Sequence, residues 1–185
     1  PPMSGHHLIL GELKDYLTGE TLPDTHDERY RQQLARLLVE SKGFLKSDLT
    51  PRVPLQVRAG EKTALLRIDL AVRLDNTIAM IVRFGPGSLT TRHRPALAAA
   101  RLLAPYQIAV AVVTNGQDAD ILDGASGKRV GSGLAQIPAR AALAARLADR
   151  PPLPVSPRRA ALEARVLYAY EVDGSCPCDD TICRL

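Results

Sequence analysis

The sequence predicts an α/β fold in which a mixed β-sheet is flanked by helices, and three observations carry this prediction. Residues 64–74 alternate between apolar and polar side chains, as a strand with one buried face does. Residues 108–114 are almost continuously apolar, which is typical of a strand buried on both faces. Helical and strand-like segments follow one another in the order α-β-β-β-α-β-β-α, which favours a mixed sheet covered by helices.

Length and composition indicate one globular domain with extensions. The chain has 185 residues, of which 45% are hydrophobic and 24% charged, and a formal net charge of +4. This mildly basic balance is compatible with an anionic partner but does not demand one. No apolar run reaches the length of a membrane span and no leader pattern is present, so we expect a cytoplasmic protein without membrane contact. The expected parts are an N-terminal extension (1–23), the main domain (24–150), a Pro-rich linker (151–157), a C-terminal helix (158–173) and a cysteine-containing tail (174–185).

The first helix of the main domain is expected over residues 26–42. Thr25 and Glu28 have the spacing of a capping box, in which each side chain satisfies a backbone N–H at the start of a helix. Apolar side chains then recur at helical spacing from Tyr30 onwards, and Gly43 supplies a stop. A weakly alternating strand follows over residues 52–58.

The strands over 64–74 and 78–84 are expected to form a hairpin. A three-residue loop places Leu74 opposite Ile78 and Asp69 opposite Arg83, with both apolar sets on one face. A two-residue turn throws these faces out of phase, and a slip of one residue turns a whole hydrophobic face to water. The longer loop is therefore predicted.

The second half of the chain completes the sheet and its helices. Asn115-Gly116 is a turn between two strands. The last helix follows a proline-rich segment, and its apolar stripe either packs on the main domain or exchanges with a second subunit to form a homodimer. The remaining elements are helices over about 94–104, 138–149 and 158–170, and strands over 108–114 and 119–122.

A glycine-rich turn, Gly85-Pro86-Gly87-Ser88, lies between a strand and a helix. Free backbone amides at such a turn and nearby arginines can hold a phosphate. The alternative is a tight turn with solvated arginines. Arg67 shares a strand face with Asp69, and this face is either solvated or directed at DNA. The candidate phosphate ligands are Arg67, Arg83, Gly85, Gly87, Ser88, Arg92 and Arg94.

Three cysteines, Cys176, Cys178 and Cys183, lie within eight residues of the tail. Thiolates favour Zn²⁺ or an iron–sulfur cluster, although a closed tetrahedral site needs a fourth ligand. The alternative is a tail with free thiols. His26 and His93 stand alone and are interpreted as surface residues.

Four segments together resemble the N-terminal nuclease domain of type I restriction enzyme R subunits, within the PD-(D/E)xK superfamily. The resemblance covers roughly residues 20–130 and includes the order of the elements. It implies a restriction-endonuclease-like fold and Mg²⁺-dependent phosphodiester hydrolysis. The segments that carry it are 24–32, 39–44, 68–75 and 112–116.

This resemblance also implies an active site that has lost metal-dependent hydrolysis. Glu28 and Asp69 correspond to the family's helix and strand carboxylates, but Arg83 and Gly85 stand where a second carboxylate and a lysine are expected. Residues 96–100 also lack the expected glutamine. We therefore predict a domain that binds nucleic acid or a phosphate-bearing ligand without hydrolysing it, with DNA as the expected partner and no cofactor at this site. In this hypothesis the Arg83 guanidinium takes the metal position and pairs with Asp69.

Two other functions stay open at the level of sequence. One is an active Mg²⁺-dependent DNA endonuclease that uses Glu28, Asp69 and residues from another segment. The other is a structural or partner-binding module that uses the C-terminal helix and the cysteine tail.

Overall fold

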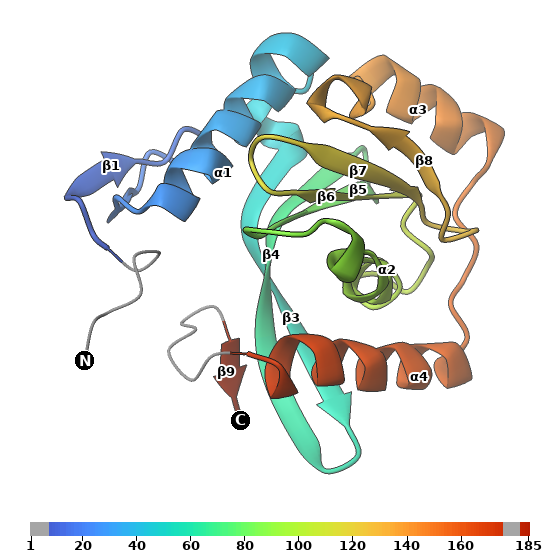
Figure 1. Cartoon of the computed structure of the whole chain (residues 1–185). Helices are drawn as coiled ribbons and strands as arrows, with labels where there is room; N and C mark the ends of the chain where they lie inside the picture. The colour runs from blue at the N-terminus through green and yellow to red at the C-terminus, as the bar shows by residue number, and fades with distance from the viewer. Residues whose placement is uncertain (1–7, 176–181) are drawn as a thin grey trace.

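The computed structural model describes residues 8–175 and 182–185, and within them a large mixed sheet is flanked by helices (Figure 1). β5 and β6 run parallel, whereas the other neighbouring strands are antiparallel. The predicted fold class is confirmed. In spatial order the seven strands of this sheet are β3 (Leu49–Ala59), β4 (Lys62–Leu74), β5 (Thr77–Phe84), β6 (Val110–Thr114), β7 (Ala119–Asp123) and β8 (Arg129–Ser132), with β9 (Ile182–Arg184) paired to β4.

Helices cover both faces of the sheet and create two hydrophobic cores. Helices α1 (His26–Arg36) and α3 (Arg140–Asp149) lie on one face, and α2 (His93–Ala100) and α4 (Pro157–Leu167) on the other. Strand β4 contributes to both cores, the second one along its first half and the first one near its end. Leu34, Leu70, Val82 and Leu143 belong to the first core, and Leu66, Ile68, Ala98 and Leu167 to the second.

The β4–β5 hairpin differs from the expected one at its turn. Leu74 pairs with Thr77, so the turn has two residues, Asp75-Asn76, and the prediction of three was wrong. An irregularity after Val72 leaves Ala79 as an extra residue on β5. This bulge shifts the pairing by one residue and brings the apolar faces back into phase, so the register farther from the turn is the expected one.

Helix ends and short strands account for the other differences. The helix predicted over 94–104 ends at Ala100, whose carbonyl accepts a hydrogen bond from Ile108 N at 3.1 Å. Helix α1 continues as a π-helical turn over Leu37–Ser41, so helical backbone covers almost the predicted range. Strand β8 and a separate hairpin of β1 (Glu12–Lys14) and β2 (Thr21–Pro23) were not predicted, since three or four residues show no reliable periodicity.

The C-terminal helix packs on its own chain. Ala164 and Leu167 of α4 are buried against the second core, beside α2 and β3. The proline-rich segment before it is also attached, because Gln107 N donates to Leu153 O at 2.8 Å and Val155 N to Pro105 O at 3.1 Å. The first of the two alternatives for this helix is thus the observed one. No helix in the described ranges is long and apolar enough to cross a membrane.

Candidate functional site

Helix α1 brings Glu28 and Arg31 beside Asp69 of β4, an inner strand of the sheet. The Thr25 hydroxyl accepts a hydrogen bond from Glu28 N at 3.1 Å and starts the helix, but the Glu28 side chain bonds to Arg31 and Gln32 and does not complete the predicted capping box. Because residues three apart lie on one side of a helix, Glu28 and Arg31 face the same strand. The ring of Phe84, on β5, lies under the Arg31 guanidinium, 5.4 Å from its carbon to the ring centroid.

An aromatic contact fixes the helix at this position. Tyr30 stacks on Phe84 with 5.7 Å between ring centroids, and on its other side it meets the turn at Gly116. A Cβ atom at Gly116 would lie 2.4 Å from the Tyr30 ring, and the backbone there has a φ of 91°. Only glycine meets both conditions without strain, so the Asn-Gly turn helps to position the site.

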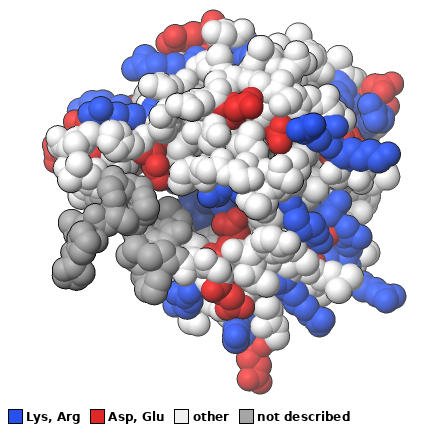
Figure 2. All heavy atoms as spheres, in the orientation of Figure 1, with Lys and Arg blue, Asp and Glu red and all other residues white. Residues whose placement is uncertain are grey.

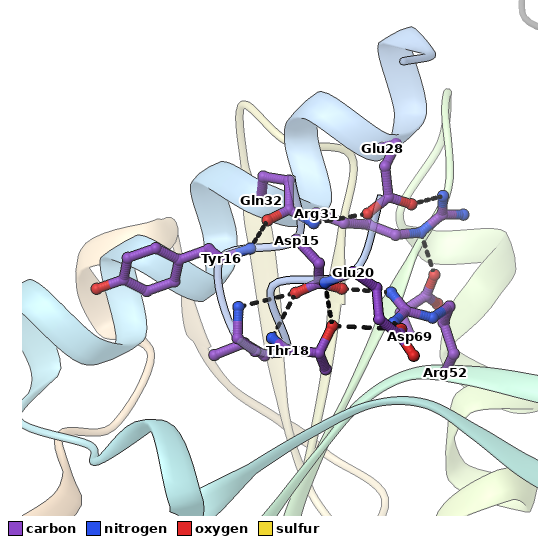
Figure 3. A network of polar contacts seen from close by, with 10 residues as sticks. Asp15, Tyr16, Thr18, Glu20, Glu28, Arg31, Gln32, Arg52 and Asp69 are labelled. Atoms are coloured by element: carbon purple, nitrogen blue, oxygen red, sulfur yellow. Dashed lines mark hydrogen bonds and ion pairs between the residues drawn. The ribbon is translucent and has the colours of Figure 1, made fainter. Parts of the chain in front are cut away.

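Arg31 joins the two candidate carboxylates (Figure 3). Its Nε lies 2.7 Å from Asp69 Oδ1, and its Nη1 lies 3.4 Å from Glu28 Oε2. The other oxygen of Asp69 accepts a hydrogen bond from Phe84 N at 2.9 Å. Burial of the guanidinium lowers the pKa of Arg31, but the charges of Asp69 and Glu28 outweigh this cost and leave its pKa above the ordinary value. Arg31 is therefore a permanent cation at the centre of the site.

The β1–β2 hairpin closes the site from outside with a second ion pair (Figure 3). Arg52 Nη1 lies 2.6 Å from Asp15 Oδ2, and Gln32 links the hairpin to Glu28 by accepting from Tyr16 N and donating to Glu28. The remaining cavity between these side chains measures about 10 Å³. Such a space holds about one water molecule.

The predicted pair between Arg83 and Asp69 is present, but it is long. Arg83 Nη1 reaches Asp69 Oδ2 only at 3.9 Å, whereas it donates to Arg67 O at 2.7 Å and Arg83 Nη2 to Glu171 Oε2 at 3.0 Å. A cation does accompany Asp69, but it comes from the helix. Glu171, 88 residues away in the chain, is the nearer carboxylate to the Arg83 guanidinium.

The candidate phosphate ligands do not converge on one point. Arg94 pairs with the buried Glu163 at 2.6 Å, on the α4 side of the sheet. Arg92 folds back over Gly85 and donates to Pro86 O at 3.1 Å. The remaining candidates Arg67, Gly87 and Ser88 are exposed.

The predictions for the two isolated histidines and for the cysteines compare differently with the structure. His26 is exposed, but His93 is not a simple surface residue, since its Nε2 lies 2.7 Å from the buried Asp120 carboxylate. Cys176 and Cys178 lie outside the described residues, and Cys183 is an exposed residue of β9. Among the residues that the structure describes, no three His, Cys, Asp or Glu side chains are grouped to hold a metal ion. The metal site of the tail stays a prediction.

Sequence reasoning missed Arg31, Asp15 and Arg52. For Arg31 a local signal exists, because it lies one helical turn after Glu28. Asp15 and Arg52 are 37 residues apart in the chain, and no periodicity connects them.

Together the sheet, the helices on both faces and the carboxylates of α1 and β4 define a mixed α/β domain compatible with a restriction-endonuclease-like fold. Residues 26–138, more than half of the chain, match the family of the type I restriction enzyme R protein N terminus, and the chain belongs to this family. The match contains the whole of α1 and every strand from β3 to β8. No curated protein and no solved structure matches the chain.

The Asp15 pair predicts a pH-dependent stability. Burial raises the pKa of Asp15, but hydrogen bonds from Arg52 and from the N–H groups of Leu17 and Thr18 outweigh it and leave the pKa below its ordinary value of 3.8. A carboxyl with a lowered folded-state pKa stabilises the fold above its unfolded pKa, and this contribution is lost as the pH falls through the folded value. Asp15→Asn should therefore cost about 1–3 kcal/mol at pH 7.

Urea unfolding at several pH values checks this expectation. The difference in free energy of unfolding between the wild type and Asp15→Asn should become smaller below a pH of about 4. Glu12→Gln, at an exposed position of the same hairpin, is the matched control and should have little effect at any pH. A difference in free energy of unfolding that stays constant down to acid pH would contradict the stabilising role of the Asp15 carboxylate.

Proposed function

We propose that this chain is a nucleic-acid-binding domain of the PD-(D/E)xK type in which metal-dependent hydrolysis has been lost. The observation that carries the proposal is the Arg31 guanidinium between Glu28 and Asp69, the two carboxylates that correspond to the metal-holding pair. Arg31 replaces Arg83 as the residue that silences the site.

The residues at this site do not fit a divalent cation. Both Asp69 oxygens already accept hydrogen bonds, and the cavity of about 10 Å³ has no room for a hydrated ion. A divalent ion at about 4 Å from the guanidinium would meet a repulsion of roughly 8 kcal/mol at an effective dielectric of 20. Arg83 and Gly85 also provide neither the second carboxylate nor the lysine. No hydrolytic step is therefore assigned to this site.

DNA is the partner that the family and the charge favour. The family is that of a restriction enzyme, and the chain has a net charge of +4. Arg67 is exposed on the same strand as Asp69 and is free to reach a phosphate group, while its backbone carbonyl holds Arg83. We infer that contact with DNA is made largely through the phosphate backbone, which makes it sensitive to salt.

Two assays on the wild-type chain test the proposal. Supercoiled plasmid should stay intact with Mg²⁺ or Mn²⁺, as it does with EDTA. Fluorescence anisotropy with duplex DNA should show affinity that falls as salt rises, with a slope that becomes shallower by about one unit in Arg67→Ala. Metal-dependent cleavage that disappears in Asp69→Asn would instead establish an active endonuclease. Absence of DNA binding at low salt would favour a partner-binding module.

A further inference from the structure

A second cavity lies on the other side of the molecule, away from α1 and the β1–β2 hairpin. It has a volume of about 610 Å³, within the range of pockets that hold small organic ligands. One wall is the segment 151–156, which connects α3 to α4 on the right of Figure 1. Backbone hydrogen bonds attach this wall to the turn after α2, so the cavity is formed without a ligand.

The polar part of this cavity is predominantly basic. Arg101, Arg146, Arg150 and Arg159 line it, with Asp123 as the acidic side chain among its lining residues. Asp123 is already paired with Arg146. Figure 2 shows Lys and Arg side chains gathered on the right-hand side of this face, near the start of α4.

The arginines near α4 have too few carboxylates for their charge. Glu163 is fully buried, and among the described residues it is the one carboxylate paired with Arg94 at 2.6 Å, Arg101 at 2.9 Å and Arg159 at 2.6 Å. Burial lowers the pKa of Arg101, and the like charges of Arg159 and Arg94 lower it further, in spite of Glu163. An anion in the cavity would relieve this excess of positive charge.

We propose that this cavity binds a phosphate ester of nucleotide size. A phosphate monoester carries close to two negative charges, and guanidinium groups form paired hydrogen bonds to phosphate oxygens. Arg101 and Arg159, which line the cavity, share the single carboxylate of Glu163. Arg159 is half exposed and Arg150 is mostly exposed, so both have N–H groups to offer. The apolar wall of Pro151, Pro152 and Leu153 provides a surface for a flat ring.

Isothermal titration calorimetry of the full chain at low salt tests this site, with AMP as the probe. AMP should bind, adenosine should not, and inorganic phosphate should bind more weakly because it makes no contact with the apolar wall. Arg159→Ala and Arg150→Ala should each weaken AMP binding about tenfold, since each removes a charge-assisted hydrogen bond. Arg158→Ala, which removes the same charge from an exposed neighbour outside the cavity, should change the affinity by less than about threefold.

Other results of these titrations would overturn the proposal or part of it. No binding of AMP at millimolar concentration, or equal losses in Arg158→Ala and Arg159→Ala, would overturn the proposal. Phosphate that binds as tightly as AMP would overturn the nucleotide-sized ligand. Circular dichroism checks that Arg159→Ala is folded, and Arg150→Ala keeps the test decisive if it is not. Competition by a 5′-phosphorylated oligonucleotide, compared with the unphosphorylated strand, distinguishes a strand end from a free nucleotide as the source of the phosphate.

Discussion

Replacing Glu163 by glutamine should lower the free energy of unfolding by roughly 3–5 kcal/mol, the usual cost of removing one partner from a buried ion pair. Glu163 lies on α4 with no exposed surface, and three arginines donate to its two oxygens. The neutral amide keeps the shape of the side chain but leaves Arg101, itself buried, without a charged partner. Urea denaturation at pH 7 measures the loss.

A matched control separates burial from charge. Glu40→Gln makes the same change in an exposed pair with Arg36, at 3.7 Å on the first helix and its π-helical turn, and should cost at most about 0.5 kcal/mol. Equal effects of the two substitutions would contradict the interpretation of Glu163 as the charge that holds α2 to α4.

The decrease in free energy of unfolding caused by Glu163→Gln should also depend on pH. Burial raises the pKa of Glu163, but Arg94, Arg101 and Arg159 outweigh it and hold the pKa below its ordinary value of 4.5. The carboxylate therefore stabilises the fold above its unfolded pKa, and the advantage over glutamine should shrink as the pH falls below about 4.5.

Replacing Arg31 by methionine should destabilise the domain by roughly 3–5 kcal/mol at pH 7, because it leaves Asp69 and Glu28 partly buried without their cation. The same substitution should create a weak site for a divalent ion, since the vacated space faces two carboxylates. Mn²⁺ should then raise the melting temperature of Arg31→Met but leave that of the wild type unchanged.

Arg29→Met is the control for this experiment. Arg29 lies on the same helix, but it pairs with Asp24 and its side chain is half exposed. We expect Arg29→Met to destabilise the domain much less than Arg31→Met does, and Mn²⁺ to leave its melting temperature unchanged. A wild-type chain that is stabilised by Mn²⁺ would show that Arg31 does not hold the metal position, and the proposed loss of hydrolysis would be wrong.

Many elements of this fold are predictable because their signals are local. The alternation of residues 64–74 indicates β4, the apolar run indicates β6, and Thr25 with Glu28 indicates the start of α1. The predicted length of the β4–β5 turn was wrong. A bulge keeps the apolar side chains of the two strands on the same face, just as a longer loop would.

The sequence by itself determined the longer strands and most of the helices, and it indicated the family that residues 26–138 match. Only the tertiary structure decided which arginine accompanies Asp69. Arg83 is close to it across the hairpin, but Glu171 is the nearer carboxylate to its guanidinium, and Arg31 arrives from a helix packed over the strands. Periodicity reports which face of an element is buried, whereas the pairing of charges depends on how separate elements approach one another. The Glu163 cluster and the basic cavity are decided in the same way, by the packing of α4 on α2 and by the attached proline segment.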